Sequence, residues 1–136
     1  MSGLPEIRHI VGEWIARAEE DLSAAELLLS QPGTWPLRSA CFHAQQCIEK
    51  YLKALLTSLS HPFSKTHDVA ELLSSVSAGT DLGLKVAELD RVNRYGVEAR
   101  YPGDWEPITR ADAEEAVKIA RATKNAVRAH IGKELL

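Results

Sequence analysis

One segment near the middle of the chain, residues 35–59, constrains the fold more than any other part of the sequence. Plotted as a helix, its apolar side chains cover an arc of roughly 200°, whereas a surface helix needs an apolar stripe of only about 100°. The arc consists of Leu37, Ala40, Cys41, Ala44, Cys47, Ile48, Tyr51, Leu52, Ala54, Leu55 and Leu56. We therefore expect a central helix that has neighbours on more than half of its circumference.

Helical patterns also dominate the rest of the chain, and strand patterns are almost absent. Apolar residues at steps of three and four predict long helices over residues 5–30, 36–60 and 82–97, and a long last helix that starts at Thr109. A short helix over residues 68–77 is expected to be capped by Asp68. Short loops normally join antiparallel neighbours. The sequence therefore predicts a single all-α domain over residues 1–136, an up-and-down antiparallel helical bundle of four long helices and one short helix.

The last helix carries two further signals. Thr109 and Asp112 have the Thr-x-x-Asp spacing of a capping box. Its apolar stripe is made of small side chains, which favours a close approach to its neighbours. The stripe consists of Ala113, Ala116, Val117, Ala120, Thr123, Val127 and Ile131.

The composition excludes several classes of protein. With 45% hydrophobic and 26% charged residues the chain is not a disordered one, and a net charge of −3 gives no general attraction to nucleic acid or anionic lipid. Any phosphate binding has to be local. The amino-terminal sequence lacks a signal-peptide core, and no run approaches the roughly 18 apolar residues of a membrane span. We expect a cytoplasmic protein with no membrane association.

The two cysteines, Cys41 and Cys47, lie roughly 240° apart on the central helix, so they cannot bond to each other. We expect buried thiols. No His, Cys, Asp or Glu residues have ligand spacing on one helical face. We therefore expect no metal site and no cofactor.

Polar side chains fill the remaining arc of the central helix. They are Arg38, His43, Gln45, Gln46, Glu49, Lys50 and Lys53. One interpretation is a solvated face with a single i,i+4 salt bridge between Glu49 and Lys53. The other is a surface that holds a charged ligand.

Asp21 falls in the middle of the apolar stripe of the first helix. A carboxylate at that place needs a cation or several hydrogen-bond donors. The candidate partners are Arg38, Lys53 and Arg100. Asp21 can serve in one buried structural ion pair, or it can stand with Glu49 and Arg100 in the wall of a polar pocket between helices.

Four motifs follow one another along the chain: "AEEDLSAAELLL" at 18–29, "ACFHAQQCIEKYLKALL" at 40–56, "KTHDVAELL" at 65–73 and "ARYPG" at 99–103. In this order and spacing the chain resembles the HEPN domain family, whose members are proposed to bind nucleotides. The resemblance implies a bundle of four main helices and a short one, often dimeric. Many members resemble metal-independent ribonucleases with an Arg-x(4–6)-His motif, acting as toxins paired with a small nucleotidyltransferase. Others resemble non-catalytic binding modules.

The catalytic motif has one match in this sequence, Arg38 with His43. These side chains point roughly 140° apart on one helix, and the match lies earlier than the place that the resemblance implies. At that place Arg100 is present, but no histidine follows in "YPGDWEP". The candidate catalytic residues are His43, Arg38 and His67. The alternative interpretation of His67 is a simpler role, as a helix cap or a hydrogen-bonding residue of the loop.

The leading prediction is a module that binds a nucleotide or RNA phosphate and that works as a homodimer with a nucleotidyltransferase partner. Its predicted ligand-binding residues are Gln45, Gln46, Glu49, Lys50, Lys53, Arg100 and Tyr101. A metal-independent ribonuclease toxin is the first alternative. A non-catalytic scaffold that dimerises through the apolar arc of the central helix is the second.

Overall fold

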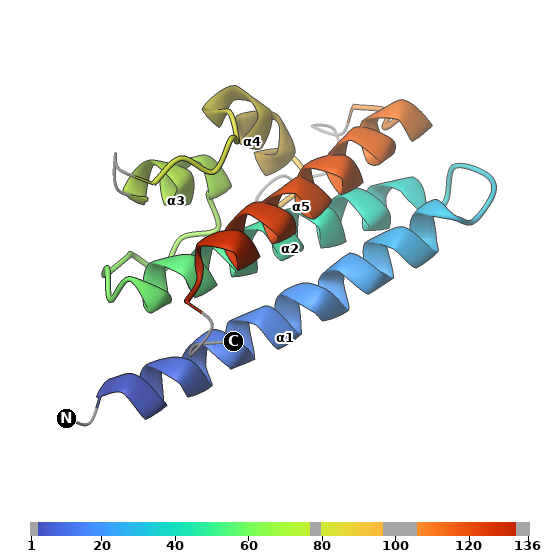
Figure 1. Cartoon of the computed structure of the whole chain (residues 1–136). Coiled ribbons are helices and arrows are strands. Elements are labelled where there is room, and N and C mark those ends of the chain that lie inside the picture. Colours follow the sequence, from blue (N-terminus) through green and yellow to red (C-terminus); the bar gives the residue numbers. More distant parts are fainter. Residues whose placement is uncertain (1–2, 77–79, 97–105, 133–136) are drawn as a thin grey trace.

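The computed structural model describes residues 3–76, 80–96 and 106–132, and these residues form helices and loops with no strand. The helices are α1 (Gly3–Leu29), α2 (Leu37–Ser58), α3 (Val69–Ser75), α4 (Val86–Asn93) and α5 (Arg110–His130). α1 and α2 run antiparallel, α3 and α4 bring the chain back, and α5 runs in the direction of α2 (Figure 1). The prediction of an all-α, up-and-down bundle is confirmed.

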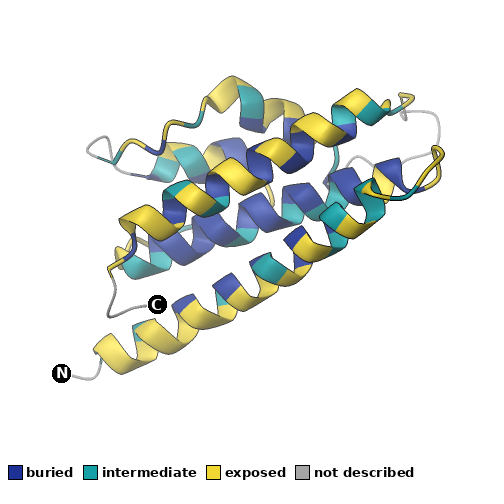
Figure 2. Ribbon diagram, turned by 45° about the vertical axis from the view of Figure 1, so that its right-hand side comes forward, coloured by how far each residue is buried: buried dark blue, intermediate teal, exposed yellow. Residues whose placement is uncertain are grey.

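α2 lies at the centre of the bundle, as its wide apolar arc predicted. Every side chain of that arc is at most 3% exposed. α1 and α5 pack on two sides of α2, and α3 and α4 cover a third side (Figures 1 and 2). Because the chain's own helices cover the arc, it is not available as a dimer interface. That part of the scaffold hypothesis is wrong.

Several helix ends follow their local sequence signals. The loop after α1 turns at Gly33, which has a φ of 87°. The Asp68 carboxylate accepts a hydrogen bond of 3.0 Å from the Glu71 backbone N–H and so caps α3. Thr109 and Asp112 form both bonds of the predicted capping box, at 3.1 and 2.9 Å. The hydrogen bond from the Thr109 backbone lowers the pKa of Asp112 below its ordinary value.

α4 is shorter than predicted. It begins at Val86 rather than at 82, because Gly83 has a φ of 70° in the left-handed region, which interrupts a helix. It ends at Asn93, whose side chain accepts a hydrogen bond from the Val69 backbone N–H at 2.9 Å and helps to cap α3. The third position of the bundle is thus filled by two short helices, and the described helices are three long and two short. Residue 97, the expected end, lies outside the described residues.

α5 approaches α2 along a face of small side chains, as predicted. All seven residues of its expected stripe are at most 5% exposed. The two cysteines are buried and free. Burial raises the pKa of Cys41 to about 11 and raises the pKa of Cys47 as well. No helix in the described part of the chain combines the length and the apolar character that a bilayer span requires.

Candidate functional site

The candidate site is the polar side of α2, which we call the α2 strip. It consists of His43, Gln45, Gln46, Glu49, Lys50 and Lys53. His43, Gln46 and Lys50 are partly exposed, whereas Gln45, Glu49 and Lys53 are buried. An ordinary solvated face would expose all six side chains. That interpretation is therefore wrong for half of the strip.

Asp21 of α1 holds two residues of the strip. One carboxylate oxygen lies 2.9 Å from Nδ1 of His43, and the other lies 2.5 Å from Nζ of Lys50. His43 and Lys50 are two helical turns apart, and Asp21 sits opposite the stretch between them. The buried carboxylate is thus paired, as expected, but the predicted partners Arg38 and Lys53 are not the ones it contacts.

Glu49 holds a second set of groups. Its carboxylate oxygens lie 3.0 Å from Nζ of Lys53 and 3.0 Å from Nδ1 of His67, in the loop before α3. The Gln45 side chain donates a 2.8 Å hydrogen bond to the His67 carbonyl, which fixes the same loop. Nζ of Lys53 also lies 5.4 Å from the centre of the Trp14 ring, at the cation–π distance. The predicted Glu49–Lys53 ion pair is confirmed, but it is buried.

The two sets share one design. In each, a buried carboxylate holds one lysine and one histidine, and the histidine side chain is partly exposed, His43 by 33% and His67 by 50%. Each carboxylate holds its imidazole through Nδ1 on the buried side of the ring. The rest of the ring is partly exposed, so a ligand can reach it. The lysine and carboxylate charges cancel, so the strip gains positive charge only from histidine protonation.

The other edge of α2 is next to the two described residues that flank the segment 97–105. A Cβ built on Gly96 would lie 3.6 Å from the side-chain amide of Gln45. Nη2 of Arg38 donates a 3.3 Å hydrogen bond to the Glu106 carbonyl. Gly96 and Glu106 are the described residues on either side of the segment. Arg100 and Tyr101, both predicted site residues, lie in it and are outside the described residues.

Arg38 and His43 serve different neighbours. His43 contacts Asp21 of α1, whereas Arg38 contacts Glu106, which precedes α5. These two partners lie on opposite edges of the α2 polar arc. The structure thus agrees with the helical spacing of the two residues, which directs them toward different elements.

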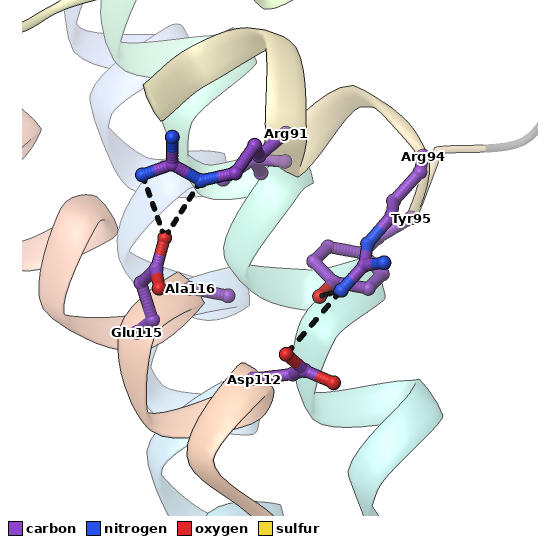
Figure 3. Close-up of a pocket in the computed structure, with 7 residues that line it drawn as sticks. Arg91, Arg94, Tyr95, Asp112, Glu115 and Ala116 are labelled. Carbon is purple, nitrogen blue, oxygen red and sulfur yellow. Dashed lines mark hydrogen bonds and ion pairs between the residues drawn. The ribbon is translucent and has the colours of Figure 1, made fainter. Parts of the chain in front are cut away.

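A small cavity between α4 and α5 contains two arginines (Figure 3). Arg91 donates to one oxygen of Glu115 from Nε and Nη2, at 3.1 and 3.0 Å. Arg94 lies over the Tyr95 ring and donates to its hydroxyl, and this hydrogen bond raises the pKa of Arg94. Nη2 of Arg94 is also 3.4 Å from Asp112. The cavity holds about 40 Å³, room for a water or two and not for a nucleotide.

Sequence reasoning missed a polar network on the opposite side of α2. Glu19 accepts hydrogen bonds from the Tyr51 hydroxyl and, at 2.9 Å, from Lys124 of α5. Nε of Arg128 donates to the Tyr51 oxygen at 3.3 Å. Burial works to raise the pKa of Glu19, but the hydrogen bonds outweigh it and the pKa lies below its ordinary value. The sequence did contain a signal for this network: Tyr51 lies in the apolar arc, and a buried tyrosine normally needs a hydrogen-bond partner for its hydroxyl.

Among the described residues, no group of three or more His, Cys, Asp and Glu side chains converges on a point where a metal ion could be held.

Comparison with known proteins identifies the family. A family model described as the HEPN domain matches residues 11–130 of this chain. The chain belongs to the HEPN domain family. The described helices agree with that fold, and α2, which carries the strip, lies wholly within the matched range.

Three similar proteins bear on the comparison. A protein of Methanocaldococcus jannaschii named as a candidate toxin, MJ1304, is 32% identical over 123 residues, which cover 79% of this chain and 78% of that protein. The crystal structure of TT1696 from Thermus thermophilus has a TM-score of 0.74 and 26% identity, over 88% of this chain and 96% of that one. The crystal structure of ST0689, an archaeal HEPN homologue, has a TM-score of 0.71 and 29% identity, over 90% of this chain and 98% of that one.

Proposed function

We propose that this chain is a HEPN module that binds a nucleotide or RNA phosphate and works with a small nucleotidyltransferase in a prokaryotic, toxin–antitoxin-like two-protein system. Membership of the HEPN family and similarity to a protein named as a candidate toxin support the setting. The nucleotidyltransferase and a homodimeric state rest on the family resemblance alone, and a cytoplasmic location rests on the sequence alone.

The observation that carries the proposal is the row of partly exposed hydrogen-bond donors along α2, oriented from behind by buried carboxylates. Lys50 and, in their protonated form, His43 and His67 offer N–H groups on one side of the bundle. Such groups suit phosphate oxygens, which accept charge-assisted hydrogen bonds. In this proposal the exposed side chains contact the ligand, whereas the buried Glu49 and Lys53 position His67.

The test is equilibrium binding of mononucleotides and of a short single-stranded RNA. A ligand at 100 times its Kd stabilises the folded protein by about 2.7 kcal/mol, which a thermal-shift measurement detects. We expect Lys50→Gln to weaken binding about 5–10-fold, because a phosphate contact is lost. Lys118→Gln, which removes the same charge from an exposed site on α5, is the matched control and should bind like the parent. No stabilisation of the parent by any of these ligands would contradict the proposal.

A ribonuclease is the second candidate, and one observation favours it. Nδ1 of His43 and Nδ1 of His67 each lie against a carboxylate, an arrangement that orients an imidazole for proton transfer. The separation of Arg38 from His43 argues against it. The same RNA samples, incubated with EDTA, distinguish the two candidates. Cleavage by the parent that His43→Gln or His67→Gln abolishes would replace the binding-only function by the enzyme.

A further inference from the structure

The α2 strip is balanced in charge, and that balance limits how it can hold an anion. Lys50 is neutralised by Asp21, and Lys53 is neutralised by Glu49. A strip made of these groups alone attracts a phosphate weakly at neutral pH, because each lysine already has a counter-charge at contact distance. A strong phosphate site needs a cation that no carboxylate has neutralised.

Arg17 of α1 is such a cation. Trp14 and Asp21 both contact the strip, through Lys53 and Lys50 respectively. Arg17 follows Trp14 by three residues and precedes Asp21 by four, which places the three on one side of α1. Arg17 is exposed, and within the described residues it makes no hydrogen bond or ion pair, even with Glu13 and Glu20 one turn away on the helix.

We propose that Arg17 is a phosphate-contacting residue, and that the binding surface extends from the α2 strip across the adjoining side of α1. This inference rests on the proposed function. Arg17 supplies the uncompensated charge, and Lys50 and the protonated form of His43 supply oriented donors. The Trp14 side chain, partly exposed and one turn from Arg17, adds an aromatic group beside the charges.

The extent of this surface favours an oligonucleotide over a mononucleotide. His43 and Lys50 are seven residues apart on α2, about 10 Å along the helix axis. The strip is a line of half-exposed groups on a helix face, and aromatic side chains stand near it at Trp14 and at Phe42, whose ring is 5.4 Å from that of His43. Linear charge with interspersed aromatic groups is typical of surfaces that bind single-stranded nucleic acid.

The test compares Arg17→Gln with Arg8→Gln. Both arginines are exposed on α1 and make no ion pair among the described residues. Nine residues separate them, so they point to opposite sides of the helix, about 180° apart. The probe is a fluorescein-labelled 12-nucleotide oligouridine, titrated by fluorescence anisotropy between 50 and 200 mM KCl. We expect Arg17→Gln to weaken binding about 5–10-fold and to lower the salt dependence by about one phosphate contact, whereas Arg8→Gln binds like the parent.

A second readout is local. Oligouridine should change the tryptophan fluorescence of the parent and of Trp35→Phe, and the change should be much smaller in Trp14→Phe. Equal affinities of the Arg17→Gln and Arg8→Gln proteins, whether both match the parent or both are weakened, would overturn the role of Arg17 and leave the proposed function standing. No binding of oligouridine or of mononucleotides by the parent would overturn both.

Discussion

At the scale of single residues, the polar groups of this protein are organised by buried carboxylates. Asp21 and Glu49 are 9% and 3% exposed, and each is paired with one lysine and one histidine. A buried ion pair adds little net stability, but removing one partner leaves a costly unpaired charge. The pairs therefore fix the positions of His43 and His67 more than they strengthen the fold.

Tyr51 offers a test of the residue-scale account through pH. Burial raises the pKa of Tyr51 above its ordinary value, and the hydrogen bond to Glu19 adds to this effect. The unfolded chain releases the tyrosine proton near pH 10, whereas the folded protein retains it, so stability falls as the pH rises above about 10. Tyr51→Phe should cost about 1 kcal/mol at pH 8 for the lost hydrogen bonds, and it should reduce the further loss between pH 8 and pH 10.8.

Urea unfolding at the two pH values measures both effects. Lysines also titrate in this range, so the informative quantity is the difference between parent and variant and not the pH dependence of either alone. An identical loss of stability in the two proteins on going to pH 10.8 would show that the Tyr51 hydroxyl is not held neutral by the fold.

At the scale of elements, helix ends with a local signal could be predicted and those set by tertiary contacts could not. Thr109 with Asp112, and Asp68 with the Glu71 backbone, lie within one turn of each other in sequence. The carboxyl end of α4 depends instead on a contact with a distant residue, because Asn93 is used as a cap for α3. A prediction from the spacing of apolar residues continues such a helix too far, because its end is set by a contact with a residue distant in sequence.

The carboxyl end of α1 depends on another distant residue. The Arg110 guanidinium donates hydrogen bonds to the carbonyls of Leu29, Gln31 and Gly33, at 2.7, 2.7 and 3.1 Å. It therefore satisfies backbone acceptors that a helix end leaves unpaired. We expect Arg110→Ala to lower the free energy of unfolding by about 1.5–3 kcal/mol, and Arg110→Lys to recover only part of that, because an ammonium cannot reproduce the planar fork.

The control is Arg121→Ala on the same helix. Arg121 makes an exposed ion pair with Glu26 at 3.1 Å, and such pairs contribute less than about 1 kcal/mol. Urea unfolding of the three variants provides the comparison. A loss in Arg110→Ala no larger than that in Arg121→Ala would mean that the guanidinium is not needed to hold the end of α1.

At the scale of the whole molecule, the sequence predicted the frame of the bundle and only part of the site. The wide apolar arc of α2 and the small-residue stripe of α5 are periodic features of single helices, so each could be read without its partners. The pairing of Asp21 with His43 and Lys50, and of Glu49 with His67, depends on how α1 and the loop before α3 settle against α2. Those distances arise only when the helices pack, which is why the need for partners could be predicted for Asp21 but their identity could not.

The small side chains of α5 allow it to lie close to α2. A pair of alanine-to-leucine substitutions tests whether this close packing is needed for stability. Ala120 of α5 is fully buried, whereas Ala122 is exposed and lines an open groove of about 370 Å³ between α4 and α5. Alanine and leucine have similar helix propensities, so the two substitutions differ mainly in the space around the side chain. Ala120→Leu should overpack the interface and cost about 1–3 kcal/mol in urea unfolding, and Ala122→Leu should change stability by less than about 0.5 kcal/mol. Equal effects would mean that α5 does not need its small side chains in order to pack, because the spacing of the helices could then adjust to leucine without strain.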